Sequence, residues 1–438
     1  MAGDTGRELA ELLHPVPPEQ FLAEYWEKQA LHIRGTPGKF AGLFDRERFD
    51  RAILHANFDR PAPSSFGIRA FWRNRHGLYA AMEIEPHQVR EAFSSRTTIC
   101  VNDISAGDAG LARFAAHIKR QLHLSTPVHF SCYLSPEGEG LDTHYDARHA
   151  TILQLSGRKQ WRYSRLPVSH YPARNAIVEQ DGRVRYADGK LVKEVPTPDE
   201  SQFEEVLLEP GDVLYLPPGC WHNAKANGES SLALTMSCST SGFMSVLVPE
   251  LERVLQQKVE WRALVPACLD ASAQAGKMPE EARRFISSRL HELHELLGKL
   301  ASDETEIERL WRRASGSSPS LAVAGQVPAS ALKPEEVLLR TEPYPLTYAQ
   351  RPGPGGVATV YLYGNSVEVA LPGDALPLVR GLASRERFKV AEVEAWAGTS
   401  LERALELLGV LLARGLLRRE AESSAAEPPA PATASHPD

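Results

Sequence analysis

The sequence predicts an α+β protein in which a strand-rich central segment is followed by helices and then by a smaller domain. Three observations lead to this expectation. Short apolar runs separated by glycine and proline turns gather at 126–242. Charged stretches with helical apolar spacing follow at 243–312. The chain of 438 residues is also longer than one hydrophobic core usually serves, so we expect more than one domain.

The composition is that of an ordinary globular protein, with 42% hydrophobic and 24% charged residues. A formal net charge of −7 argues against an extended nucleic-acid-binding surface. The sequence contains neither an apolar run long enough to span a bilayer nor the pattern of a signal peptide. The five cysteines form no Cys-x-x-Cys pair, which favours reduced thiols over disulfides. We therefore expect a cytoplasmic protein that binds neither a membrane nor nucleic acid.

His144 and Asp146, separated by one residue, are the strongest indication of chemistry. Residues two apart on an extended strand point to the same side, so these two side chains can share a ligand. His222 follows the turn Pro-Pro-Gly at 217–219 and begins another predicted strand. Two histidines and one carboxylate can occupy one face of an octahedral metal ion and leave three positions open, as in non-haem Fe(II) oxygenases. The alternative is that these polar residues only satisfy hydrogen bonds in a core.

Two longer motifs contain these residues. Residues 138–146 follow the pattern Gly-x5-His-x-Asp and residues 211–222 the pattern Gly-x5-Pro-x-Gly-x2-His, and these resemble the first and second motifs of the cupin family. The first motif is followed at 153–162 by Leu-Gln-Leu-Ser-Gly-Arg-Lys-Gln-Trp-Arg. In this order the motifs resemble the JmjC-domain oxygenases and, among them, the ribosomal oxygenases. The resemblance implies a double-stranded β-helix, the jelly-roll fold of cupins, for the core.

The resemblance also implies a cosubstrate and the residues that hold it. Relatives use Fe(II), 2-oxoglutarate and O2, with the metal on the two histidines and the aspartate named above, which are thereby also the catalytic residues. The far carboxylate of 2-oxoglutarate needs a charge-assisted hydrogen bond from a buried base. By the family match this base is Lys159, with Arg158 as the alternative. Ser131 and Ser237 fall where the family places further contacts with the cosubstrate.

These expectations define an enzyme, a 2-oxoglutarate-dependent dioxygenase that hydroxylates a protein side chain. The resemblance to ribosomal oxygenases suggests a ribosomal protein as the substrate. Other reactions of the same class are demethylation of methyl-lysine and hydroxylation of a peptide natural product or of RNA. From a different class, the chain could be a non-catalytic cupin that binds a metal or a small ligand. Lys159 argues against this last alternative, because a structural metal site needs no carboxylate anchor.

The sequence divides into six regions, five of which flank the JmjC or cupin core. The expected regions are a mixed α/β buttress of the barrel at 1–125, the core at 126–242, a helical region at 243–312, a linker at 313–334, a winged-helix-like domain at 335–420 and a disordered tail at 421–438. Within the core, the polar insert 170–201 contains two Asp-Gly turns and is expected to be a hairpin or a substrate-facing loop.

The helical region carries an apolar stripe among its charges. The stripe consists of Phe285, Leu290, Leu293, Leu296 and Leu297. The resemblance implies that this region dimerises, so we expect a homodimer. Packing of the stripe on the barrel is the alternative that the pattern alone leaves open.

The winged-helix-like domain has little charge excess. Residues 380–420 contain eight Lys or Arg and six Asp or Glu. A surplus of two positive charges is too small for a face that follows phosphates. We therefore expect a structural or protein-contact role for this domain.

Overall fold

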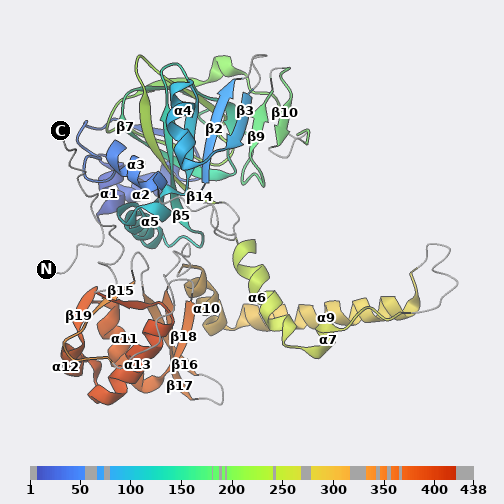
Figure 1. The fold of residues 1–438 in the computed structure, drawn as a ribbon. Helices are drawn as coiled ribbons and strands as arrows, with labels where there is room; N and C mark the ends of the chain where they lie inside the picture. Colours follow the sequence, from blue (N-terminus) through green and yellow to red (C-terminus); the bar gives the residue numbers. More distant parts are fainter. Residues whose placement is uncertain are drawn as a thin grey trace, which may run out of the picture.

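The computed structural model describes residues 7–54, 67–73, 79–179, 181–186, 190–192, 195–239, 243–267, 278–315, 332–341, 346–352, 357–364 and 367–420. Their strands and helices form a barrel domain and a smaller C-terminal domain, which lies below the barrel in Figure 1. A helical segment joins the two domains. Part of this segment, which includes the helix α9 (Glu280–Ser302), extends to one side as an arm. The predicted α+β class is confirmed.

Two antiparallel sheets form the barrel. The larger sheet has the order β1-β12-β7-β14-β5-β4-β2-β3, and the smaller sheet has the order β10-β9-β6-β13-β8-β11. The strands of the central segment are β5 (Val128–Ser135), β6 (Gly140–Tyr145), β7 (Arg148–Ser156), β8 (Lys159–Tyr163), β11 (Glu204–Leu208), β12 (Val213–Leu216), β13 (His222–Ala226) and β14 (Ser231–Ser239). From β5 to β8 and from β11 to β14 the chain alternates between the two sheets, which is the topology of a double-stranded β-helix.

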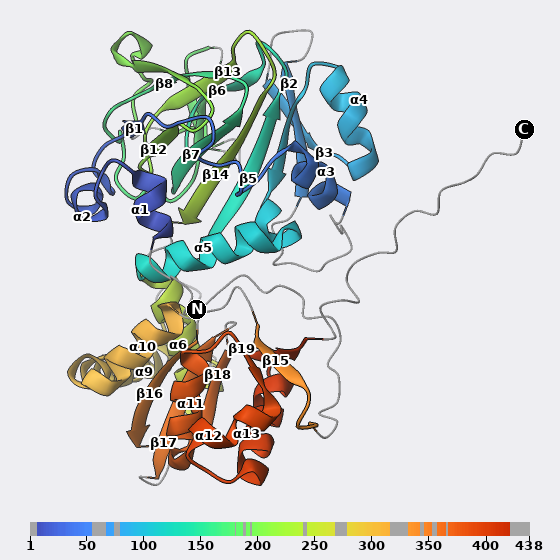
Figure 2. The same ribbon diagram turned by 90° about the vertical axis from the view of Figure 1, so that its left-hand side faces the viewer.

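The N-terminal region extends the larger sheet at both of its edges. β1 (Leu31–Ile33) pairs with β12, while β4 (Thr98–Asn102), β2 (Gly67–Arg73) and β3 (Tyr79–Glu83) continue the sheet beyond β5. The helices of this region are α1 (Glu8–Leu13), α2 (Pro18–Gln20), α3 (Arg46–Leu54), α4 (Val89–Ser94) and α5 (Ala109–Gln121), with short helical turns η1 (Phe21–Tyr25), η2 (Pro86–Gln88) and η3 (Ile104–Gly107). Figure 2 shows α5 at the end of the barrel that faces the C-terminal domain.

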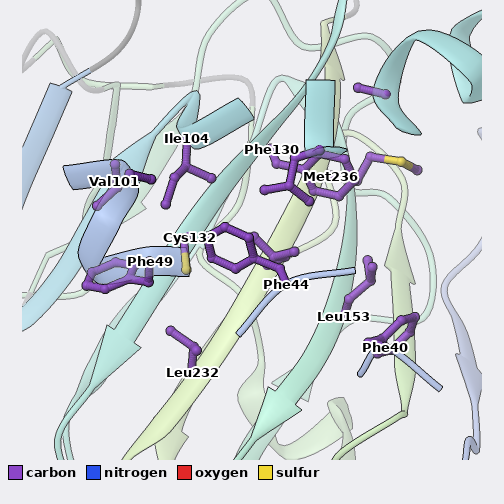
Figure 3. Close-up of a cluster of buried hydrophobic side chains, with 14 of the residues drawn as sticks. Phe40, Phe44, Phe49, Val101, Ile104, Phe130, Cys132, Leu153, Leu232 and Met236 are labelled. Atoms are coloured by element: carbon purple, nitrogen blue, oxygen red, sulfur yellow. The ribbon is translucent and has the colours of Figure 1, made fainter. Parts of the chain in front are cut away.

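The main hydrophobic core lies between the outer face of the larger sheet and these helices. β5 and β14 contribute Phe130, Cys132 and Met236 to it, next to Phe49 of α3 (Figure 3). Full burial of such a side chain stabilises the fold by about 1.5–3 kcal/mol. Successive side chains of a strand point to opposite faces. The residues that alternate with Phe130, Cys132 and Met236 along β5 and β14 therefore face the interior of the barrel.

The polar insert forms a hairpin, one of the two expected structures. β9 (Ala176–Val178) and β10 (Val184–Tyr186) are its antiparallel strands. β9 also pairs with β6, and this register sets Ile177 opposite His144. The short turn η4 (Glu200–Gln202) then leads into β11. The insert therefore belongs to the smaller sheet and lies beside the first motif.

In the described residues, four helices follow the barrel, and the C-terminal domain follows them. The helices are α6 (Met244–Gln256), α7 (Val259–Arg262), α9 (Glu280–Ser302) and α10 (Glu304–Ser315). The domain contains the sheets β16-β17-β18 and β19-β15-β20. Its elements are β15 (Val337–Arg340), β16 (Thr347–Pro352), β17 (Ala358–Gly364), β18 (Val367–Pro372), η6 (Gly373–Ala375), α11 (Leu376–Ala383), β19 (Arg387–Lys389), η7 (Val390–Glu392), α12 (Glu394–Ala397), α13 (Leu401–Ala413) and β20 (Leu417–Arg419).

Most of the predicted linker and the whole predicted tail lie outside the described residues. In the described part of the chain, each helix is too short or too polar to cross a bilayer.

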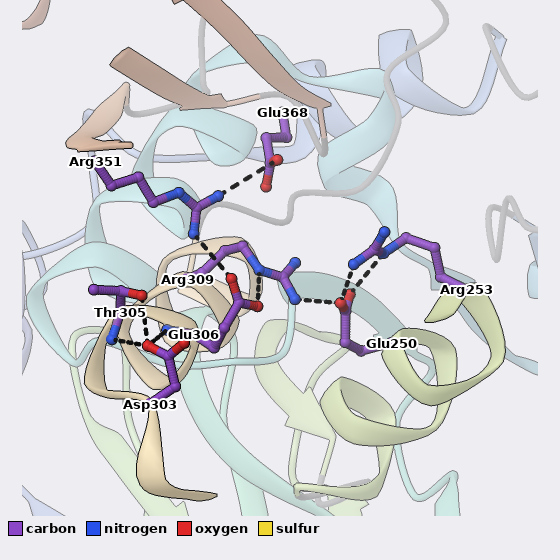
Figure 4. A network of polar contacts seen from close by, with 8 residues as sticks. All are labelled: Glu250, Arg253, Asp303, Thr305, Glu306, Arg309, Arg351 and Glu368. Carbon is purple, nitrogen blue, oxygen red and sulfur yellow. Dashed lines mark hydrogen bonds and ion pairs between the residues drawn. The ribbon is translucent and has the colours of Figure 1, made fainter. Parts of the chain in front are cut away.

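A set of ion pairs joins the helical segment to the C-terminal domain (Figure 4). Glu250 of α6 is 2% exposed and bonds to Arg253 and to Arg309 of α10. Nε of Arg309 also donates to Glu306 at 2.7 Å. Glu306 in turn lies 3.8 Å from Arg351 of β16. A buried charge on α6 is thus linked through α10 to a strand of the C-terminal domain.

Candidate metal centre

The three predicted metal ligands meet between neighbouring strands of the smaller sheet. His144 lies in β6, Asp146 directly follows this strand, and His222 is the first residue of β13. The antiparallel register of β6 and β13 sets His144 opposite His222, and their ring centroids are 4.2 Å apart. One potential ligand atom from each of the three residues lies within 4.8 Å of the others. The structure thus brings together the residues that the two motifs indicated.

Both imidazole rings are oriented through Nδ1. His144 Nδ1 donates to the backbone oxygen of Asp142 at 2.6 Å, and His222 Nδ1 donates to that of Cys220 at 2.9 Å. A ring that donates from Nδ1 keeps its lone pair on Nε2. Burial, and after it the charge of His144, lowers the pKa of His222 to about 3, so this ring is neutral near pH 7. Orientation of the ring by a backbone hydrogen bond from Nδ1, which both residues show, is typical of metal-binding histidines.

Asp146 supplies the negative charge of the group. Burial raises the pKa of its carboxyl, but the charges of Arg148 and then of the two histidines outweigh burial, and the net pKa is lowered. Arg148 Nη2 lies 3.8 Å from Oδ1 of Asp146. Asn175 donates a hydrogen bond from Nδ2 to the same oxygen at 2.5 Å. The carboxylate is therefore ionised at neutral pH and can pair with a metal cation.

A tight turn in the second motif delivers His222 to the site. Gly219 has a φ of +83°, and a Cβ at this position would lie 2.1 Å from the backbone oxygen of Ser169. The N–H of Gly219 donates to the backbone oxygen of Asp146 at 2.9 Å. Only glycine combines this conformation with such a close approach without strain. The turn therefore links the two motifs through their backbones.

A cavity lies beside the three residues, inside the barrel. Its wall consists of Tyr133, Leu141, His144, Asp146, Ala150, Ile152, Lys159, Trp161, His222, Ala224, Ala233 and Thr235. Both sheets contribute to this wall, because the inward-facing side chains of β5, β7 and β14 oppose those of β6, β8 and β13. The wall is mostly apolar, and its acidic and basic side chains are those of Asp146, the two histidines and one lysine.

Lys159 is a buried cation within this cavity. It is 2% exposed, and its Nζ donates to Oγ of Ser135 at 3.1 Å. Nζ lies 5.7 Å from the ring centroid of Tyr133 and 6.0 Å from that of Trp161. In the described part of the chain, no carboxylate forms an ion pair with it. Burial lowers the pKa of Lys159 to about 8. A buried ammonium group without a carboxylate partner provides a binding site for an anion.

Arg158, the alternative base, lies outside the barrel. Its side chain is 43% exposed, and its Nε lies 3.6 Å from the exposed Glu229. Successive residues of a strand point to opposite faces, so only one of the two neighbours can enter the cavity. The geometry therefore favours Lys159 over Arg158.

Ser131 and Ser237 are buried on β5 and β14. By the alternation of side chains they share the inner face with Tyr133 and Thr235. Tyr133 and Thr235 line the cavity, whereas the two serines are not among its lining residues. Contact of the serines with a cosubstrate therefore remains a prediction.

Several residues near the site, among them Tyr133, Thr235 and Asn175, were not predicted as site residues from the sequence. Tyr133 and Thr235 each lie two positions from a predicted serine on the same strand, so strand alternation is the signal that could have found them. Asn175 lies in the polar insert, far along the chain from Asp146, and no spacing rule connects the two.

A comparison of families identifies the class of this domain. Residues 109–245 match the JmjC domain, and this range includes both motifs and every strand that lines the cavity. Residues 109–245 are therefore similar in sequence to a JmjC domain, and they form most of the two-sheet topology described above. The predicted fold and the predicted resemblance to JmjC-domain proteins are confirmed.

Ribosomal oxygenases and their relatives are similar to this chain. Ribosomal oxygenase 1 of Gallus gallus is 28% identical over 311 residues, which make up 67% of this chain and 49% of that protein. The bifunctional lysine-specific demethylase and histidyl-hydroxylase NO66 of Aedes aegypti is 28% identical over 299 residues, or 66% of this chain and 41% of that protein. The chain thus spans about half the length of these curated relatives, or less.

A solved structure shares the fold over nearly the whole chain. YcfD, a ribosomal oxygenase from Escherichia coli in complex with cobalt and 2-oxoglutarate, matches with a TM-score of 0.55 and 18% sequence identity. The match covers 93% of this chain and 99% of that chain. At this identity the likeness shows the fold.

Proposed function

We propose that the protein is an Fe(II)- and 2-oxoglutarate-dependent oxygenase that hydroxylates a protein side chain. The observation that carries the proposal is one cavity that contains both a His-Asp-His group and a buried lysine to which the described residues supply no carboxylate partner. The first is the ligand set of non-haem iron oxygenases. The second matches the far carboxylate of 2-oxoglutarate. A non-catalytic cupin would have no need of this lysine.

The donor atoms fit a divalent iron ion. His144 and His222, each through Nε2, and Asp146 would hold the ion from one side and leave its other side open. When Fe(II) is bound, the site supplies the oxidation of a substrate C–H bond to C–OH by O2, coupled to conversion of 2-oxoglutarate into succinate and CO2. Lys159 would anchor the far carboxylate of 2-oxoglutarate and so set its direction in the cavity. The apolar wall would exclude water from the reaction.

The substrate that we propose is a side chain of a ribosomal protein. Support comes from the relatives, two of which are named a ribosomal oxygenase and a histidyl-hydroxylase. Demethylation of lysine is the second candidate reaction, because the NO66 relative is also named a lysine-specific demethylase.

Mass spectrometry of ribosomal proteins tests this substrate. Ribosomal proteins incubated with the Fe(II)-loaded protein, 2-oxoglutarate and O2 should gain the mass of one oxygen atom on a single residue. The Asp146→Ala variant should leave them unmodified. Loss of a methyl group with release of formaldehyde would instead establish demethylation. Steady consumption of 2-oxoglutarate with no modified protein would contradict a protein substrate.

We further propose that the protein is a homodimer held by residues 243–312. In the described chain no residue of α9 is buried. The apolar side chains of Leu290 and Leu297 are therefore exposed on the surface of this helix. An apolar groove between α7 and α9 is lined by Trp261, Phe285 and Leu293 among others. Exposed apolar surface of this kind marks an interaction site. A second copy of the helix, related by a two-fold axis, would cover it.

Charged residues on this surface should separate the dimer. The double variant Leu293→Glu and Leu297→Glu is expected to be monomeric by light scattering at micromolar concentration, because burial of two carboxylates in an apolar interface is unfavourable. The matched control is His291→Glu with His294→Glu, which adds the same charges to exposed positions of the same helix and should remain dimeric. A monomeric parent protein would refute the proposed dimer.

For the whole chain we propose the region boundaries 1–125, 126–242, 243–312, 313–334, 335–420 and 421–438. We propose that 335–420 acts as a winged-helix-like module that contacts protein, which its helices α11, α12 and α13 and the sheet β19-β15-β20 support. The proposed location is the cytoplasm. The free thiols of Cys100, Cys132, Cys220 and Cys238 in the described residues are consistent with it, and Cys268 lies outside those residues.

A further inference from the structure

Asn175 contacts the metal site from outside the two motifs. It directly precedes β9 in the insert. Its Nδ2 donates to Oδ1 of Asp146 at 2.5 Å, and its own Oδ1 accepts the N–H of Ala147 at 2.8 Å. A backbone N–H can only donate, so the amide oxygen must face Ala147 and the amide nitrogen must face the carboxylate. The orientation of the Asn175 amide is therefore fixed by two bonds.

These bonds distinguish the two oxygens of the carboxylate. Oδ1 of Asp146 accepts the hydrogen bond from Asn175 and lies nearest to Arg148. For Oδ2, the described residues supply no hydrogen bond. Within the described residues, Oδ2 therefore keeps both of its lone pairs for a cation, whereas Oδ1 has one occupied by Asn175. A carboxylate that binds a metal through one oxygen occupies one coordination position, and two histidines with such a carboxylate leave three positions open.

The insert is also paired with the strand that carries the first motif. Ile177 lies opposite His144, and Ala176 lies opposite Tyr145. Asn175 thus directly precedes a strand that pairs with His144 through the backbone ladder, while its own side chain contacts Asp146. A movement of the hairpin would displace Asp146 relative to His144.

We infer that Asn175 is a positioning residue of the metal centre, which holds Asp146 for ligation through one oxygen and couples the insert hairpin to the metal. This rests on the proposed metal-binding role of the three residues. Asn175 does not itself contact the ion. It acts through Asp146, as outer hydrogen-bond partners of metal ligands do.

Cobalt binding tests this role without turnover. Co(II) in place of Fe(II) gives a dissociation constant and a visible absorption spectrum that reports the coordination of the ion. In the Asn175→Ala variant we expect the dissociation constant for Co(II) to rise about 10–100-fold, with an altered spectrum. The thermal midpoint of the metal-free variant should stay close to that of the parent, since only two hydrogen bonds of a half-buried side chain are lost.

Asn223→Ala is the matched control. Asn223 directly follows His222 and donates from Nδ2 to Oγ1 of Thr143 at 2.9 Å, so the variant removes a similar amide from the same sheet without a contact to a metal ligand. Its Co(II) affinity and spectrum should match those of the parent. Parent-like binding in Asn175→Ala, or equal losses in both variants, would overturn the inference.

Hydrogen exchange of the unsubstituted protein gives a second test, which does not depend on the variant folding. Binding of Co(II) should slow amide exchange both in a peptide around 145–149 and in a peptide around 171–179. Slowing in the first peptide alone would overturn the coupling of the insert to the metal. An Asp146→Ala variant that binds Co(II) as well as the parent would instead refute the metal centre itself.

Discussion

The charge on Lys159 depends on the pH. Burial lowers the pKa of this side chain to about 8, and in the described residues its hydrogen-bond partner is a neutral serine hydroxyl. The protonated form therefore predominates below about pH 8, and the neutral form predominates above it. Only the protonated form can make a charge-assisted hydrogen bond to the far carboxylate of 2-oxoglutarate.

The affinity for 2-oxoglutarate should consequently fall as the pH rises through about 8. Calorimetry with Co(II)-loaded protein between pH 6.5 and 9.5 would measure this fall, at roughly tenfold per pH unit above the pKa. In Lys159→Arg the guanidinium stays charged, so the fall should be absent. Arg158→Ala should behave like the parent because that side chain lies outside the barrel. A parent affinity that is flat up to pH 9.5 would contradict the anchor role.

Among single residues, the sequence predicted those whose neighbours along the chain form a motif. His144 with Asp146, and His222 after its turn, could be found because each motif encodes a strand or a turn with a fixed side-chain direction. Lys159 could be separated from Arg158 only by the family match and then by the structure. Asn175 could not be predicted, because its contact with Asp146 depends on how the insert folds back.

Among the elements, the turn at Gly219 places a specific demand on the backbone. Alanine at this position would have a φ of +83° and a Cβ 2.1 Å from a backbone oxygen. Gly182, in the insert, has a φ of +78° but open space around its missing Cβ. Alanine at Gly182 would meet only the cost of the backbone conformation, whereas alanine at Gly219 would also meet the cost of the close approach. Comparing the two substitutions therefore separates the two costs.

Gly182→Ala should destabilise the protein by about 1 kcal/mol, the cost of a left-handed conformation. Gly219→Ala should cost more than about 2 kcal/mol, because the turn must also move away from Ser169. Denaturant unfolding would measure both changes. Co(II) affinity should fall only in Gly219→Ala, since that turn positions His222. Equal effects of the two substitutions on stability and on metal binding would contradict this account of the turn.

The larger elements were predicted unevenly. The strand-rich core could be read from apolar runs and turns, because these patterns are local. The attachment of β1 to β12 could not be read, since it joins residues near 32 to residues near 214. The direction of the arm, which leaves the body beside the C-terminal domain in Figure 1, likewise depends on packing between distant segments.

In the whole molecule, α10 connects the barrel to the C-terminal domain. On the barrel side, Nζ of Lys119 in α5 donates to the backbone oxygen of Ala314 at 3.1 Å. On the side of the C-terminal domain, Glu306 of α10 lies 3.8 Å from Arg351 of β16. Within the helical segment, Arg309 of α10 bonds to Glu250 of α6, and both are buried. Burial by itself raises the pKa of Glu250. The hydrogen bonds from Arg253 and Arg309 together outweigh burial, and the resulting pKa is about 2. Glu250 therefore stays ionised through the neutral and mildly acidic range.

Glu250→Gln should destabilise the protein by about 3 kcal/mol, because it leaves the buried Arg309 with a weaker partner. Guanidinium unfolding at pH 7 would measure the loss. Since the folded-state pKa is depressed from 4.5, this contribution is present above about pH 4.5 and is lost as the pH falls toward 2. The difference between parent and variant should shrink over that range. Glu281→Gln, in an exposed pair with Arg284, is the control and should change stability by less than about 0.5 kcal/mol.

The most direct test of the central claim is release of succinate from 2-oxoglutarate. Protein loaded anaerobically with Fe(II) and then exposed to O2 should form succinate slowly even without a protein substrate. His144→Ala, Asp146→Ala and His222→Ala should each abolish this release while remaining folded by circular dichroism, because each removes one of the three proposed iron ligands. Succinate release at the parent rate in these variants would contradict the assignment of the metal centre.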